Sequence, residues 1–159
     1  MIKKLLLTST ILAFMTSTTF ATEINTKAKK DITLSTQCTT YYETFAKLNA
    51  MEYSVAVSSG DKNAKMYLQI AELSAHKLNA FITITEYLSD KYTKTMPKEE
   101  ISKLVNTEMD KDELFYNTLA KSISETNLPL ILEKMSSADK GCTSFGTTII
   151  NEIKKGSKS

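Results

Sequence analysis

Cys38 and Cys142 are the two cysteines of this 159-residue chain, and each lies on a stripe of apolar residues at helical spacing. Thiols can form a disulfide, bind a metal or act as a redox pair. The two cysteines form no C-x-x-C motif, which argues against a thiol oxidoreductase of the usual type. We therefore expect a Cys38–Cys142 disulfide that ties the first helix of the mature chain to the last, with two buried free thiols as the alternative.

Carboxylates on apolar helix faces are a second group that could do chemistry. Glu52 projects near the middle of the first apolar stripe, and Glu108 and Asp112 would join it if the third helix were continuous. Carboxylates inside a helical bundle can hold a di-iron site, but that site uses a Glu-x-x-His element on each of two helices, which this sequence lacks. The C-x-x-C-H motif for haem attachment is also absent. We expect no metal and no cofactor, with Glu52 reaching an edge of the bundle or pairing with a lysine.

His76 is the single histidine, on the polar face of its helix and one turn after Glu72. One histidine and one carboxylate do not complete a zinc site. A general base would also need a nucleophile and an orienting group in a pocket, and the sequence indicates neither. We interpret His76 as a surface residue, assign no catalytic residue and predict that the protein is not an enzyme.

Two tyrosines of the first helix are candidates for contact with a partner protein. Tyr42 and Tyr53 share one flank of this helix, with Ala46 between them. Tyrosine gives a large contact area at a low cost in conformational entropy, so the pair could anchor a partner. The alternative is that another helix of the same chain covers this flank.

The first 21 residues, MIKKLLLTSTILAFMTSTTFA, have the three parts of a secretory signal peptide: a basic start, an apolar stretch and a small-residue end. The apolar stretch, from Leu5 to Met15, is too short to span about 30 Å of hydrocarbon. We expect cleavage after Ala21, export to the periplasm or beyond, and no stable membrane span afterwards. An uncleaved N-terminal membrane anchor is the alternative.

Composition argues against nucleic-acid binding. The 20 basic side chains are all lysines, and arginine is the residue best suited to bidentate recognition of phosphates and guanine edges. Cleavage would remove Lys3 and Lys4 but no acid, so the net charge of +2 belongs to the signal peptide. The mature chain is close to neutral, which removes the main support for binding nucleic acid or anionic membranes.

Apolar residues recur every three or four positions along the mature chain, which indicates helices. We predict an all-α, up-down bundle of four helices closed by one disulfide. The first helix covers residues 36–58 and is closed by Gly60, and Asp61 caps the second. Pro97 opens the third helix, and the last begins near Pro129.

Two of these helices contain residues that could break them, which would give five helices. Glu108 and Asp112 would be costly on the apolar side of a continuous third helix, so we expect a kink or new start near residues 107–110. In the last helix, Gly141 and Gly146 either allow close approach of a neighbouring helix or break the segment near residues 139–141.

The predicted organisation is a signal peptide (1–21), a loose N-terminal segment (22–30), a helical-bundle domain (31–155) and a loose tail (156–159). Export, small size and the lack of converging catalytic residues favour a non-enzymatic binding protein of the bacterial cell envelope, such as an inhibitor, an immunity protein or a chaperone-like module. Its partner would be another protein. The alternative is a small ligand- or metal-binding bundle with carboxylates in its core.

Overall fold

The computed structural model describes the backbone of residues 2–121 and 128–156, and the side chains of residues 23–112, 114, 118 and 133–156. Within those ranges the chain is all-helical: α1 spans Ile2–Ser59, α2 Ala64–Tyr92, α3 Lys98–Lys121 and α4 Leu128–Gly156. The predicted all-α fold is confirmed.

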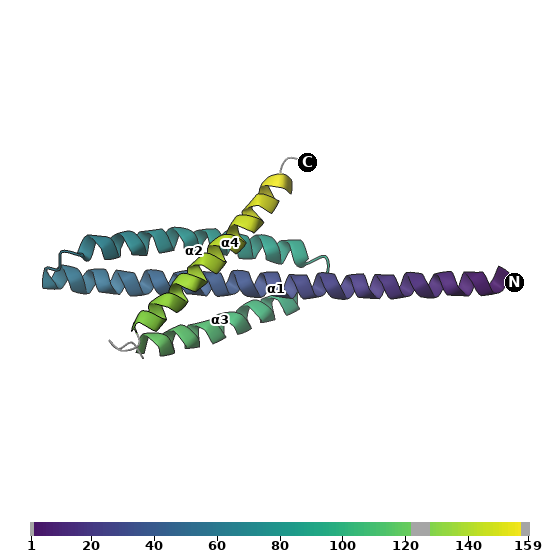
Figure 1. The fold of residues 1–159 in the computed structure, drawn as a ribbon, viewed down its shortest axis with the longest axis horizontal. Helices are drawn as coiled ribbons and strands as arrows, with labels where there is room; N and C mark the ends of the chain where they lie inside the picture. Colours follow the sequence, from purple (N-terminus) through teal and green to yellow (C-terminus); the bar gives the residue numbers. More distant parts are fainter. Residues whose placement is uncertain (1, 122–127, 157–159) are drawn as a thin grey trace.

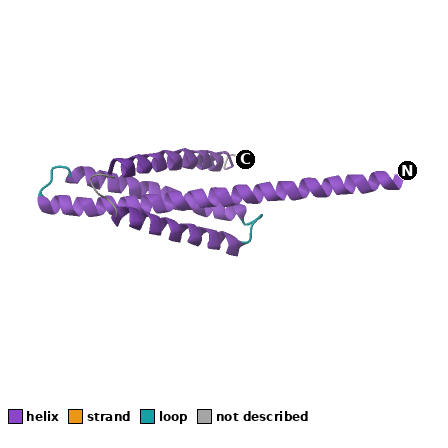
Figure 2. Cartoon of the chain, turned by 60° about the horizontal axis from the view of Figure 1, so that its bottom comes forward, coloured by secondary structure: helices purple, strands orange, loops and turns teal. Residues whose placement is uncertain are grey.

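The four described helices run alternately up and down, with α1 at their centre (Figure 1). α2 and α3 pack along α1, whereas α4 crosses α1 and α2 obliquely and makes smaller contacts with them. Figure 2 shows α3 and α4 on different sides of α1. Between residues 32 and 42, α1 is buried on every side, at Ile32, Ser35, Thr36, Cys38, Thr40, Tyr41 and Tyr42.

Three contacts fix the antiparallel register of α1 and α2. The Tyr92 hydroxyl donates to Asp31 Oδ2 at 2.5 Å, and the ring of Tyr42 stacks on Phe81 with centroids 5.5 Å apart. Between these two contacts, the hydroxyls of Thr39 and Thr85 lie 3.4 Å apart. All three contacts fit one continuous pairing, in which the residue number rises along α1 as it falls along α2.

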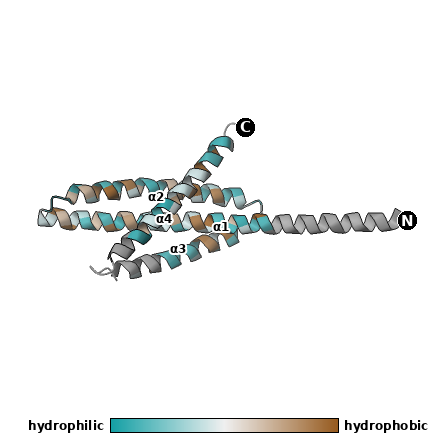
Figure 3. Cartoon of the chain, viewed as in Figure 1, coloured by the Kyte–Doolittle hydropathy of each residue, from teal (hydrophilic) through white to brown (hydrophobic). Residues whose placement is uncertain are grey.

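Both helices carry a heptad-like repeat in this register, with contact positions alternately three and four residues apart. In α1 these positions are Ala28, Ile32, Ser35, Thr39, Tyr42, Ala46, Asn49, Tyr53 and Ala56; in α2 they are Ala64, Tyr67, Ala71, Ser74, Leu78, Phe81, Thr85, Leu88 and Tyr92. The register places small residues opposite large ones, such as Ala46 opposite Leu78 and Tyr53 opposite Ala71. Such alternation lets two helices pack closely without gaps. Figure 3 shows that hydrophobic and hydrophilic residues are interspersed along the described helices.

Gly60 ends α1 as predicted. Its φ of 70° is in the left-handed region that glycine adopts readily, and Asp61 N–H donates to the Ala56 carbonyl at 2.8 Å. The predicted cap of α2 is wrong in position. Asp61 Oδ1 accepts a bond from the Asn63 N–H at 2.8 Å, and Asn63 itself stands at the N-cap, so Asp61 shapes the turn that leads into α2.

The predicted break in α3 is wrong, because the helix is continuous from Lys98 to Lys121. Glu108, although only 12% of its side chain is exposed, is not unpaired. It accepts hydrogen bonds from Lys111 Nζ at 2.8 Å and from Gln37 Nε2 of α1 at 3.4 Å. These partners offset the cost of placing the carboxylate on a buried face.

α4 is also continuous, so the predicted break near residues 139–141 does not occur. Gly146 instead allows α4 to approach α2 closely, which was the alternative expectation. A Cβ atom at this position would lie 3.0 Å from Cζ of Phe81 on α2. Gly141 has nothing within 4 Å of the equivalent position, so it has no such role.

The segment 22–30 was expected to be loose, but it belongs to α1. Ala28 is fully buried, and Lys29 Nζ lies 2.8 Å from Glu100 Oε1 of α3. The contact positions of α1 therefore begin earlier than the predicted helix start at residue 36. At the other end, Gly156 belongs to α4, and residues 157–159 lie outside the described range.

Candidate functional site

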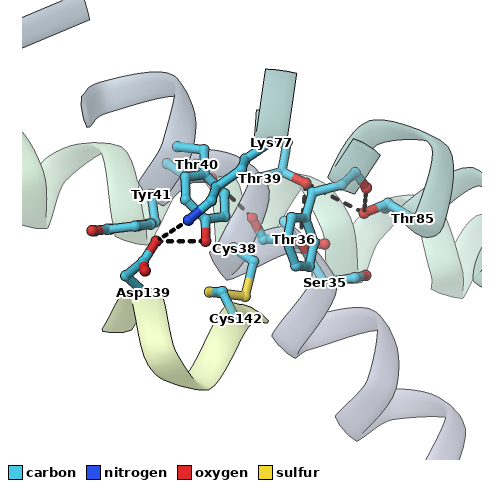
Figure 4. Close-up of a disulfide and its surroundings, with 12 residues drawn as sticks. Ser35, Thr36, Cys38, Thr39, Thr40, Tyr41, Lys77, Thr85, Asp139 and Cys142 are labelled. Atoms are coloured by element: carbon cyan, nitrogen blue, oxygen red, sulfur yellow. Dashed lines mark hydrogen bonds and ion pairs between the residues drawn. A yellow bond between two sulfur atoms is a disulfide. The ribbon is translucent and has the colours of Figure 1, made fainter. Parts of the chain in front are cut away.

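The predicted disulfide is present and joins α1 to α4. The sulfur atoms of Cys38 and Cys142 are 2.07 Å apart, and their Cα atoms are separated by 5.6 Å. Figure 4 shows the bond beside the buried hydroxyl residues of α1. Ser35 and Thr36 each donate to the Ile32 carbonyl at 2.9 Å, so these polar groups are satisfied inside the core.

One ion cluster next to the disulfide connects α4 to both α1 and α2. Asp139 Oδ1 accepts a bond from Lys77 Nζ at 2.7 Å (Figure 4). The same oxygen accepts a bond from the Tyr42 hydroxyl at 2.9 Å, and Lys77 Nζ also lies 5.1 Å from the centre of the Tyr42 ring. Burial alone would raise the pKa of the Asp139 carboxyl. The bonds from Lys77 and Tyr42, with the lysine charge, outweigh burial and hold this pKa below its usual value.

A second ion cluster connects α4 to α2 nearer the C-terminus. Glu152 pairs with Lys91 and accepts a bond from the Tyr87 hydroxyl at 3.3 Å. The Lys91 bond lowers the pKa of the Glu152 carboxyl, although burial opposes the shift. Lys91 Nζ also lies 5.2 Å from the centre of the Tyr92 ring. Two lysine–carboxylate pairs therefore hold α4 on α2, and in each of them a tyrosine also donates to the carboxylate.

The proposed partner contact through Tyr42 is wrong, because the residue is 1% exposed and its hydroxyl is bonded to Asp139. Tyr53 is half-buried on the same face, opposite Ala71 in the α1–α2 register. The flank that these two tyrosines share is therefore the face that α1 packs against α2. This was the alternative explanation of the pair, and it follows from the heptad-like repeat.

The structure does not bring Glu52 together with the other two candidate carboxylates. Glu52 is exposed on α1, whereas Glu108 and Asp112 are partly buried one turn apart on α3. Burial, together with the neighbouring Glu108, raises the pKa of Asp112, and its buried Oδ2 has no hydrogen-bond partner among the described residues. His76 is exposed, as predicted. Among the described side chains, no three histidine, cysteine, aspartate or glutamate residues lie close enough to hold a metal ion.

An open groove lies between α2 and α3, with a volume of about 790 Å³. α1 contributes Thr39 and Glu43 to it. The other lining residues are Leu78, Ile82, Thr85, Glu86, Ser89, Asp90 and Thr93, followed by Lys98, Ile101, Ser102, Val105, Asn106 and Met109. None of the described side chains of α4, residues 133–156, lines it. A volume of this size is within the usual range of roughly 300 to 1,000 Å³ for ligand sites.

Apolar side chains at this groove remain open to solvent. Ile82 of α2 is 41% exposed and Met109 of α3 is 37% exposed, while Ile101 at the same groove is buried. The described lining residues also include three carboxylates and one lysine, so the groove combines an apolar surface with a negative margin. Surfaces of this kind, apolar with a polar rim, are typical of interaction sites.

The groove was not predicted from the sequence, because Ile82 fits the apolar spacing of α2 and so resembles a core residue. The available signal was that Ile82 lies outside the alternating three- and four-residue repeat that faces α1. An apolar residue outside that repeat must face a third helix or solvent.

A comparison of the chain with protein-family models, curated proteins and solved structures found no match. Among the described residues, no helix is both long and apolar enough to cross a membrane.

Proposed function

We propose that this chain is a non-enzymatic binding protein that holds a segment of another protein in the groove between α2 and α3. The exposed apolar surface of the groove carries this proposal. Ile82 and Met109 reach it from opposite walls, and burying them against a partner would remove apolar area from water. Such burial is worth about 25 cal/mol per Å² before the costs of association are subtracted.

The same proposal places the protein outside the cytoplasm, in the periplasm or secreted, after cleavage following Ala21. The Cys38–Cys142 disulfide is consistent with an oxidising compartment. An inhibitor, an immunity protein or a chaperone-like module would each fit this arrangement, and neither catalysis nor nucleic-acid binding forms part of it.

The test is site-specific photo-cross-linking in the native compartment. A photoreactive amino acid replaces Ile82 in one variant and Leu73 in its control. Both residues are apolar and exposed on α2, Leu73 at 58%, but Leu73 does not line the groove. The proposal predicts a discrete protein adduct from position 82 that is absent from position 73.

Two further measurements make the result specific. The Ile82→Glu variant should lose the partner while keeping the thermal stability of the wild type, because the residue already faces solvent. Adducts of equal yield and identity from positions 82 and 73, or none from position 82 in a correctly exported protein, would contradict the proposed site.

A further inference from the structure

The dimensions of the groove match a short helix. Its lining runs from Leu78 on α2 to Thr93, the C-cap of that helix, and from Lys98 to Met109 on α3. At 1.5 Å per residue, these walls are roughly 22 Å and 16 Å long, which corresponds to a helix of about three to four turns. An amphipathic helix laid into an apolar groove is a recurrent mode of peptide recognition.

The apolar residues of the groove follow helical rows. Ile101, Val105 and Met109 are each one turn apart on α3, and Leu78 and Ile82 are one turn apart on α2. Two facing rows can receive the apolar stripe of a third helix between them, as ridges pack into grooves. The remaining lining is mostly hydroxyl residues and Asn106, which can border such a stripe.

The charges of the groove are unequally distributed between its walls. Glu86 and Asp90 are one turn apart on α2, and neither makes an ion pair with the described residues. Glu43 of α1 adds a third carboxylate, which Lys47 approaches at 2.7 Å. On the α3 wall, Lys98 is the basic residue among the described lining residues. The α2 side is therefore negative along about one helical turn, with its carboxylates available to a bound cation.

Building on the function proposed above, we infer that the occupant of the groove is a basic amphipathic helix. Its apolar stripe packs between Ile82 and the row ending at Met109. Lysine or arginine residues spaced one turn apart, on the flank facing α2, pair with Glu86 and Asp90. This arrangement specifies the partner by sequence pattern: a segment of about 11 to 15 residues with apolar residues at helical spacing and basic residues along one edge.

The inference is tested with two synthetic peptides of about 15 residues and blocked ends. Both carry the same leucine stripe, and their polar positions are all lysine in one and all glutamate in the other. Binding is measured by fluorescence anisotropy with the disulfide-bonded chain. The lysine peptide should bind more tightly, on the order of tenfold at low ionic strength, and the difference should shrink as salt is added.

A charge reversal with a matched control separates the groove from general electrostatics. Glu86→Lys with Asp90→Lys should reverse the preference between the two peptides. The control, Glu72→Lys with Glu133→Lys, changes the net charge equally at exposed positions outside the groove and should leave the lysine peptide preferred. Equal binding of the two peptides, or reversal by both double variants, would overturn the inference.

The cross-linking experiment keeps this inference distinct from the function on which it rests. A protein adduct at position 82 whose cross-linked segment is acidic or uncharged would overturn the basic helix and leave the binding function intact. A lipid adduct or an adduct with a second copy of this chain would also refute the basic-helix occupant. If position 82 gives no adduct at all, both the basic-helix occupant and the proposed binding function are contradicted.

Discussion

The two glycines inside α4 should respond oppositely to the same substitution. At position 141 a methyl group would meet nothing within 4 Å, so Gly141→Ala gains helix propensity without a clash. That gain is roughly 0.5 to 1 kcal/mol in a helix interior. At position 146 the new Cβ would lie 3.0 Å from Cζ and 3.5 Å from Cε2 of Phe81, and 3.6 Å from Cδ1 of Ile84.

Relief of the contact at position 146 is restricted, because Phe81 is buried and its ring stacks on Tyr42. Overpacking of a core costs about 1 to 3 kcal/mol, from which the propensity gain must be subtracted. We therefore expect Gly146→Ala to lower the free energy of unfolding by about 1 kcal/mol, and Gly141→Ala to raise it by slightly less.

Equilibrium urea denaturation followed by circular dichroism measures both variants with the disulfide intact. A double-mutant cycle tests whether the contact with Phe81 is the cause. Phe81→Leu alone should lower the free energy of unfolding, but in its presence Gly146→Ala should cost less, because leucine does not reach as far as the phenylalanine ring that the new Cβ would meet. If both glycine variants stabilise the chain equally, α4 does not approach α2 at Gly146, and the close packing inferred here is refuted.

Three further predictions concern the contacts of α4 and the partly buried carboxylate of Asp112. Folding lowers the pKa of Asp139 and Glu152, so their stabilisation is present above the ordinary pKa of each carboxyl and is lost as pH falls through the lowered pKa of the folded state. Acid titration of the unfolding free energy should consequently be flatter in Asp139→Asn with Glu152→Gln than in the wild type. Because folding raises the pKa of Asp112, Asp112→Asn should stabilise the chain at neutral pH and have less effect in acid, as measured by thermal unfolding at both pH values. Replacing both cysteines by alanine opens a loop of sequence separation 104 and should cost about 2 to 4 kcal/mol in urea denaturation with little change in helix content.

The sequence predicted the helices and the disulfide because both depend on patterns that local residues carry. Apolar spacing, Gly60 and Pro97 mark the element ends, and two cysteines on apolar stripes have one intramolecular pairing available. The continuity of α3 was missed for the opposite reason. Gln37, which helps to satisfy Glu108, lies 71 residues away, and no local pattern shows that it will be there.

To predict the burial of Tyr42, one must know which of the several apolar faces of α1 meets which helix. α1 is central, so residues on nearly all of its sides are apolar or small, and a single stripe cannot be assigned to one neighbour. Only the register with α2 separates the face of Tyr42 and Tyr53 from the face of Cys38. The groove was missed for a related reason: apolar periodicity marks Ile82 as a contact residue, but it does not tell whether the contact is made within the chain.

The contacts that hold α4 and the residues that line the groove are separate sets. α4 is contacted by Cys38, Tyr42 and Lys77. The groove is lined by other residues of the same two helices, among them Thr39, Glu43 and Ile82. α1 can serve both because its neighbours α2, α3 and α4 surround it without closing the space between α2 and α3. Substitutions at Ile82 or Glu86 consequently leave the disulfide and both ion clusters in place. A loss of binding in such variants therefore reports on the groove itself, and the stability of the same variants provides the internal check.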